Sequence, residues 1–253
     1  MAFGKHRADD DAAEVTAADE VDDIDEADEL DGPFDIDDFD DPSTAALGRL
    51  DLGSVLIPMP EAGQVQVELN EMGVPSAVWV VMPPNGRFTI AAYAAPKTTG
   101  LWREVATELA DSLGKDVQKV TIEDGPWGRE VIGVAAAEQG QPPNVVRFIG
   151  IDGYRWMIRC VVNGPQDRIA MLSQEARNAL TDTVIRRGDT PLPVRTPLPV
   201  QLPEPMAAQL RAAAEQAVQQ QAAQAQQQAP PQPAARRSEL GTAMQQLRTI
   251  TGG

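Results

Sequence analysis

Short runs of alternating hydrophobic and polar residues fill the middle of the sequence. Residues 64–69 alternate strictly and residues 87–93 alternate again, which predicts strands with one covered face. Residues 77–82 are continuously apolar, as in a strand covered on both sides. Similar runs follow at residues 117–123, 129–136, 145–151 and 154–162. The pattern predicts a largely antiparallel sheet of about six or seven strands.

The last two of these runs are joined by an Asp-Gly dipeptide at residues 152–153, which favours a two-residue hairpin turn. Side chains alternate between the faces of a strand, so pairing across this turn places Ile149 and Trp156 on one face of the sheet. Phe148 and Met157 then lie on the other face. Both faces of the sheet are therefore expected to be covered.

Two segments have the period of a helix. Residues 101–113 carry leucine or valine at every fourth position, with a threonine at 98 or 99 to cap the start and Gly114 at the site of a left-handed C-terminal residue. We expect a second helix to start at residues 163–165, with proline at the favoured first helical position, and to end at Gly188. Its apolar stripe covers residues 169–184. The strands and these two packed helices indicate an α+β fold, layered like an α/β/α sandwich.

The domain organisation follows from composition. We expect a disordered acidic arm at residues 1–48, the α+β domain at residues 49–188, and an extended proline-rich segment at residues 189–205 that contains the repeat Thr-Pro-Leu-Pro-Val. An Ala/Gln-rich tail of low complexity with candidate helices fills residues 206–253.

Charge is concentrated in the arm. The first 42 residues hold 18 acidic residues, all between Asp9 and Asp41, against Lys5 and Arg7, so they account for −16 of the net charge of −17. Carboxylates at this density repel one another, and the arm has too few apolar residues to offset the entropy of ordering its backbone. The rest of the chain is nearly neutral.

The arm also contains apolar side chains between its carboxylates, at Phe34, Ile36 and Phe39. An acidic tail that only keeps a protein soluble has no use for such residues. We therefore interpret these three as anchors with which the arm docks a protein partner that has a basic surface. A purely solubilising tail remains the alternative.

Arg147, Arg155 and Arg159 form a second candidate surface for a partner. They lie on the last predicted hairpin beside aromatic residues, a combination that can bind nucleic acid. The nearly neutral domain and the acidic arm disfavour that reading, and pairing with carboxylates at the edge of a covered sheet is the simpler explanation. A further alternative is that the arm folds back on these arginines and masks them.

The residue types that catalysis needs are scarce. The one histidine, His6, lies in the arm, and the one cysteine, Cys160, lies in an apolar run, where we expect a buried structural thiol. Zinc would need clustered Cys and His, and no glycine-rich phosphate-binding motif occurs. Glu123 and Asp124 are adjacent, but neighbours in a strand point to opposite faces. We expect no catalytic residue, no metal and no cofactor.

The cellular location is inferred from the same features. One cysteine excludes an internal disulfide and fits a reducing compartment. The first residues run directly into acid without an apolar leader, and no stretch approaches the roughly 18 apolar residues of a membrane span. We expect a cytoplasmic protein that does not enter the membrane.

Three motifs resemble an actinobacterial protein family of unknown function: residues 34–40, the hairpin at residues 152–159 and residues 187–194. The resemblance covers about residues 30–203. The family has no established activity, so it implies no catalytic residues. The order of strands and helices also resembles the PsbP-like α/β/α sandwich, whose known members are mostly binding proteins, a likeness at the level of fold alone.

These observations favour a non-enzymatic protein-binding or adaptor module that uses its acidic arm. Two alternatives stay open: a nucleic-acid-associated protein regulated by the arm, and an enzyme that uses carboxylates on a small molecule. Steep salt dependence of oligonucleotide binding would mark the first alternative, and a deep polar pocket with two perturbed acids would mark the second.

Overall fold

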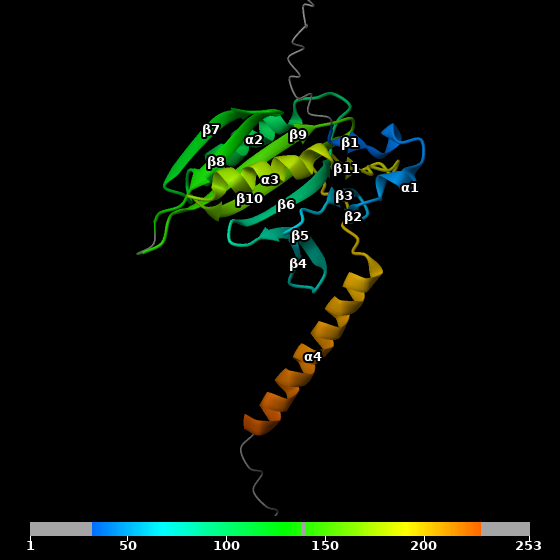
Figure 1. Cartoon of the computed structure of the whole chain (residues 1–253), viewed down its shortest axis with the longest axis vertical. Helices are drawn as coiled ribbons and strands as arrows, with labels where there is room; N and C mark the ends of the chain where they lie inside the picture. Colours follow the sequence, from blue (N-terminus) through cyan, green and yellow to red (C-terminus); the bar gives the residue numbers. More distant parts are fainter. Residues whose placement is uncertain (1–31, 138–139, 229–253) are drawn as a thin grey trace, which may run out of the picture.

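A central sheet with one helix on each face forms the body of the protein (Figure 1). The structure is a computed structural model and describes residues 32–137 and 140–228. A second, four-stranded sheet lies at one end of the body, and a long C-terminal helix projects away from it (Figure 1). The α+β fold and the largely antiparallel sheet expected from the sequence are confirmed.

The central sheet contains seven antiparallel strands in the order β4-β5-β6-β10-β9-β8-β7. Their bounds are β4 (Gln64–Leu69), β5 (Pro75–Met82), β6 (Gly86–Ala94), β7 (Lys119–Gly125), β8 (Gly128–Val134), β9 (Asn144–Asp152) and β10 (Trp156–Pro165). The strands follow the hydrophobic runs of the sequence because each run buries alternate side chains on one face of the sheet.

The pairing of β9 with β10 fixes which side chains share a face. Ile149 lies opposite Cys160 and Phe148 lies opposite Val161, so the predicted assignment of the two faces is confirmed. The turn itself is longer than expected, because Asp152 pairs with Met157 and four residues, Gly153–Trp156, lie between the paired positions.

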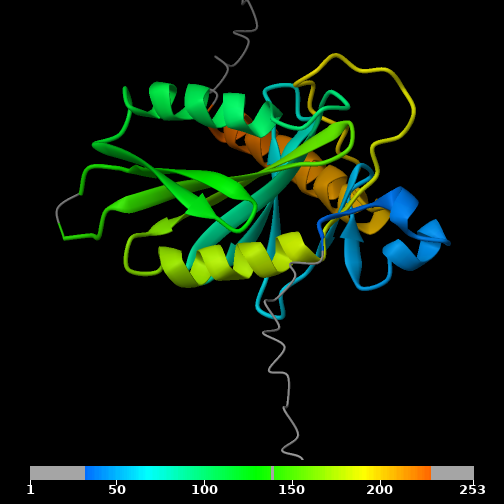
Figure 2. The same ribbon diagram turned by 90° about the horizontal axis from the view of Figure 1, so that it is seen from above.

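Helix α2 (Leu101–Leu113) covers one face over β7–β9, and helix α3 (Ile169–Thr181) covers the other over β6 and β10 (Figure 2). The predicted threonine cap is wrong: the carboxylate of Asp152 accepts hydrogen bonds from the backbone N–H groups of Gly100 and Trp102, both at 2.9 Å. Gly114 follows α2 in a right-handed conformation with φ −58°, so the expected left-handed residue is also wrong.

Helix α3 is shorter than predicted at both ends. Its expected start at residues 163–165 is wrong because these residues pair within the central sheet as the end of β10, and the apolar residues after the helix join a second sheet. Val184–Ile185 form β11 in the four-stranded sheet, whose order is β1-β11-β3-β2. The other strands of this sheet are β1 (Phe34–Asp35), β2 (Arg49–Asp51) and β3 (Val55–Pro58). Val184 and Ile185 are fully buried there, and burial in a sheet suits β-branched residues better than a helix end does.

Residues 33–48, which the sequence assigned to a disordered arm, belong to the folded unit. They form β1, a 3₁₀ turn η1 (Ile36–Asp38) and a short helix α1 (Pro42–Ala45). The apolar residues of this segment bury themselves against the domain, which offsets the repulsion among its carboxylates. The rest of the predicted arm, residues 1–31, lies outside the described residues.

Residues 189–203, here called the proline strap, contain a turn at residues 194–195 and pair with the free edge of β6 through residues 195–198. Leu198 N–H donates to Ala92 O at 2.9 Å, and Ala94 N–H donates to Thr196 O at 2.8 Å. Helix α4 (Glu204–Gln228) follows the strap, and residues 229–253 lie outside the described residues.

Candidate functional site

A split in the central sheet creates an opening between β5 and β6. Strands β5 and β6 pair from Met82 opposite Gly86 to Trp79 opposite Thr89. Beyond that point β5 stays with β4, whereas β6 continues beside β10 and receives the proline strap on its other edge. Helix α2 packs over β7–β9 and leaves the split uncovered (Figure 2).

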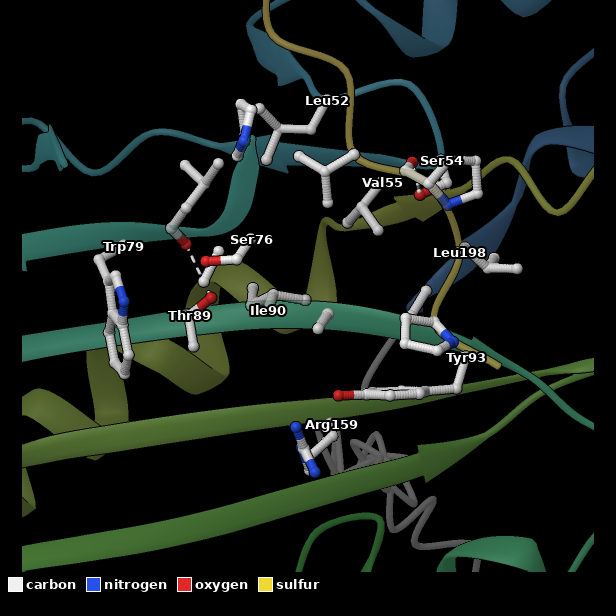
Figure 3. Close-up of a pocket in the computed structure, with 18 of the residues that line it drawn as sticks. Leu52, Ser54, Val55, Ser76, Trp79, Thr89, Ile90, Tyr93, Arg159 and Leu198 are labelled. Carbon is white, nitrogen blue, oxygen red and sulfur yellow. Dashed lines mark hydrogen bonds between the residues drawn. The ribbon is translucent and has the colours of Figure 1, made fainter. Parts of the chain in front are cut away.

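The opening is a pocket of about 600 Å³, here called the sheet pocket (Figure 3). Its walls come from β5, β6, β10, the strap, the turn before β5 and the segment that enters β3. The side chains that line the pocket include Trp79, Thr89, Ala91, Tyr93, Arg159 and Leu198.

The serine and threonine hydroxyl groups in this pocket are already engaged. Thr89 Oγ1 donates to Val78 O at 2.7 Å, and Ser54 Oγ donates to Pro199 O at 2.8 Å. Ser76 Oγ donates to Glu68 O at 3.1 Å. With these donors bonded to the backbone, the walls present mainly hydrocarbon and aromatic surface.

Arg159 is the charged side chain of the pocket. Its guanidinium carbon lies 4.9 Å from the centre of the Tyr93 ring, a cation–π contact (Figure 3). Within residues 32–137 and 140–228, no carboxylate lies within ion-pair distance of it, and its buried Nε has no hydrogen-bond partner. The charge of Arg159 is therefore uncompensated by the described part of the chain.

A second, smaller hollow of about 250 Å³, here called the α2 groove, lies between α2 and the sheet. It shares Tyr93 and Arg159 with the sheet pocket, so these two residues stand where the two hollows meet. Arg195 of the strap also lines the groove and binds Glu108 of α2 at 2.8 Å. This ion pair ties the strap to α2 beside the groove.

Arg147, predicted with Arg159 as part of one surface, lies on the opposite face of the sheet. It binds Glu130 at 2.5 Å and Glu123 at 3.1 Å, and Arg177 of α3 binds Glu130 at 2.8 Å. Glu130 is 2% exposed, so Arg147 belongs to an enclosed ion network and offers no free charge. The pairing with carboxylates considered from the sequence describes this residue.

Arg155 lies at neither place, because it occupies the loop between β9 and β10. It lines a polar hollow of about 120 Å³ together with Asp35, Asp37, Arg186 and Arg187. The three arginines therefore do not form the single surface that the sequence predicted. Arg147 pairs with Val162 and Arg159 pairs with Gly150, so their side chains point to opposite faces of the sheet. Arg155 lies in the loop because the turn is longer than predicted.

Phe34, Ile36 and Phe39, the predicted anchors for a partner, are partly buried against the protein's own domain. They pack on a cluster of Ala45, Leu56 and Val184, each 0% exposed. The segment is also fastened by Trp156, whose Nε1–H donates to Asp35 Oδ2 at 2.8 Å. These anchors thus contact the domain itself while part of each side chain stays exposed, and their role in docking another protein stays a prediction.

Sequence reasoning missed Trp79, Ala91 and Tyr93 as members of a pocket. Residues 77–82 were expected to be covered on both faces, but only the Val78, Val80 and Met82 side is fully buried. The alternation that begins at residue 87 was a usable signal, because it indicated one incompletely covered face.

Cys160 is fully buried, and burial raises the pKa of its thiol far above the ordinary range, so the thiol stays protonated. Among the described residues, no three His, Cys, Asp or Glu side chains gather closely enough to hold a metal ion. No helix in the described ranges combines the length and apolarity needed to cross a membrane.

Several solved structures share part of the arrangement of this chain. A protein from Bacteroides thetaiotaomicron VPI-5482 is 14% identical with a TM-score of 0.35 over 58% of this chain, which spans about half (51%) of that protein. Cyanobacterial PsbP (CyanoP) from Synechocystis sp. PCC 6803 is 7% identical with a TM-score of 0.33, over 55% of this chain and 93% of CyanoP.

A third structure is that of LpqN, a protein involved in cell envelope biogenesis of Mycobacterium tuberculosis. LpqN is 12% identical with a TM-score of 0.30, over 52% of this chain and 83% of LpqN. No curated protein matches the sequence. Residues 32–209, from the first described residue into α4, match the family described as protein of unknown function (DUF3710), and the chain belongs to that family.

Proposed function

We propose that the protein is a non-enzymatic binding module that holds an apolar small molecule in the sheet pocket. The observation that carries the proposal is the pocket itself, a preformed opening of about 600 Å³ with mainly apolar walls. This volume lies within the range of roughly 300–1,000 Å³ typical of small-molecule sites.

The walls of the pocket are rigid. They come from paired strands and from prolines of the strap, which is hydrogen-bonded to β6 on both sides of the Tyr93–Pro197 bridge. Rigid walls reduce the conformational entropy that binding must remove. An apolar ligand that enters would displace water from aromatic and aliphatic surface, which favours binding in proportion to the area covered.

The chemistry of the lining favours binding over catalysis. The side chains around the sheet pocket include no histidine, cysteine or carboxylate among the described residues. General acid–base or nucleophilic catalysis needs such groups beside the substrate. The alternative of an enzyme that uses carboxylates thus gains no support from this pocket.

A neutral apolar dye tests the proposal on the full-length chain. N-phenyl-1-naphthylamine should bind with increased fluorescence, and Ala91→Phe should weaken binding by roughly tenfold because the new ring occupies the pocket area that the dye would cover. Ala62→Phe, at an exposed position in the turn before β4, is the matched control. Equal binding by both variants, or no binding by the unaltered chain, would contradict the proposal.

A protein-binding adaptor role is the second candidate, and the charge of the N-terminal residues favours it. Residues 1–31 contain 13 acidic residues against two basic ones, a composition that attracts a basic partner. Because residues 33–48 pack on the domain, the truncation that tests this role removes residues 1–31 only. A partner from a nuclease-treated extract should be lost with this truncation, and retention of the same partners would refute the role.

A further inference from the structure

We infer that the ligand of the sheet pocket carries a single carboxylate, which Arg159 binds where the sheet pocket meets the α2 groove, while the apolar body of the ligand fills the sheet pocket. This inference rests on the proposed function and specifies the class of ligand. An amphipathic monocarboxylate, with one acidic head and an apolar chain, has that chemistry.

The charge of the lining is the first argument. Among the described residues that line the sheet pocket, Arg159 is the one charged side chain. Three other partly buried arginines have carboxylate partners: Arg147 and Arg177 share Glu130, and Arg186 binds Asp51. A shielded cation without a counter-charge is costly, so an anion that reaches Arg159 gains a charge-assisted hydrogen bond that the described chain does not provide.

The geometry of Arg159 is the second argument. Its guanidinium packs on the Tyr93 ring, which occupies one face of the guanidinium and restricts its orientation. Guanidinium N–H groups point outward in the plane of the group, so its edges stay suited to a planar carboxylate. Tyr93 is itself held by pairing with Met157 on one side and with Pro197 on the other.

The surroundings limit the head to one negative charge. The α2 groove also contains Glu108, which is bound to Arg195 of the strap. Arg195 binds Glu104 as well as Glu108, so its charge is fully offset. Arg159 is therefore the one uncompensated cation among the described residues that line the two hollows. A dianionic head such as a phosphate monoester would have one charge unmatched and would face the Glu108 carboxylate.

Two probes of equal chain length separate the head from the body of the ligand. Calorimetric titration of the full-length chain with dodecanoate and with dodecanol, above the pKa of the fatty acid, measures the contribution of the carboxylate. We expect dodecanoate to bind about tenfold to 100-fold more tightly than dodecanol, the range for a hydrogen bond between charged groups.

Arg159→Gln should remove this difference by weakening dodecanoate about tenfold to 100-fold while dodecanol changes by less than about twofold. Arg159→Lys keeps the charge but not the planar fork, so dodecanoate should bind it with intermediate affinity. Arg103→Gln, on the exposed side of α2, removes the same charge elsewhere and should change neither titration. Dodecanol binding also reports whether each variant keeps an intact pocket.

The outcomes distinguish this inference from the proposed function. If neither probe binds and the apolar dye also fails, the pocket is not a binding site and the proposed function is refuted. If both probes bind equally to the unaltered chain, or Arg159→Gln weakens both equally, the pocket binds ligands but the carboxylate assignment is overturned. Selective loss of dodecanoate binding in Arg159→Gln supports the inference.

Discussion

Glu130 is a buried carboxylate whose charge should be essential for stability. It is 2% exposed and binds both Arg147 and Arg177, whose side chains are 17% and 20% exposed. The substitution Glu130→Gln keeps the volume of the side chain and removes its charge. Two largely enclosed guanidinium groups would then face an amide in place of their counter-ion.

The expected loss in the free energy of unfolding is about 3 kcal/mol, since removing one partner of a buried ion pair costs about 3–5 kcal/mol. The lower end of this range applies because both arginines keep some contact with water and Arg147 keeps its ion pair with Glu123. Domains are stable by about 5–15 kcal/mol, so this loss is a large fraction of the total.

Urea unfolding of the full-length chain measures this loss as a lower midpoint with an unchanged slope. Glu123→Gln is the matched control, because Glu123 binds the same Arg147 but is 54% exposed, and its loss should stay below about 1 kcal/mol. A loss below about 1 kcal/mol for Glu130→Gln, or equal losses in the two variants, would refute the reasoning that burial makes this network costly to break.

Three further predictions concern the frame around the site. Asp152→Ala should lower stability by about 1 kcal/mol in urea unfolding, because its carboxylate caps α2. Gly150→Ala should cost about 1–3 kcal/mol or prevent folding, since a Cβ there would lie 1.9 Å from the Trp102 ring. Asp51→Asn should flatten the loss of stability below about pH 4. Although burial raises the pKa of Asp51, hydrogen bonds from Arg186 and Gly53 hold this pKa below its ordinary value. The Asp51 carboxylate therefore stabilises the fold above its unfolded-state pKa, and this stabilisation is lost as the pH falls through its folded-state pKa.

Each of these has a control on the same molecule. Asp111→Ala, exposed on α2, should change stability by less than about 0.5 kcal/mol. Gly114→Ala should be neutral or stabilise by about 0.4–1 kcal/mol, because Gly114 has φ −58° and its nearest neighbour would be 3.5 Å from the new Cβ. If the stability of Asp51→Asn falls as steeply below about pH 4 as that of the unaltered chain, the pH prediction is contradicted.

Local patterns in the sequence were sufficient to predict most strands and both packed helices, because burial of one face imposes a period of two or 3.6 on the chain. They failed where a distant residue supplied the partner. The cap of α2 is Asp152, about 50 residues away along the chain, and no local rule could select it over the neighbouring threonines.

The candidate site shows the same division. Arg159 was predicted as a binding residue from its place beside aromatic residues, but its grouping with Arg147 and Arg155 depended on a turn length that the sequence left open. Phe34, Ile36 and Phe39 were recognised as anchors, yet their binding surface is formed by Leu56 and Val184, which come from distant parts of the chain.

By itself, the sequence determined the fold class, the faces of the β9–β10 hairpin and the uneven distribution of charge, since each depends on residues close together in the chain. Only the tertiary structure decided where β5 leaves β6, and that the strap pairs with the freed edge. The sheet pocket exists because these non-local pairings open the sheet at a place that α2, which packs over β7–β9, does not cover. The periodicity of a single strand carries no information about which distant segment will cover it.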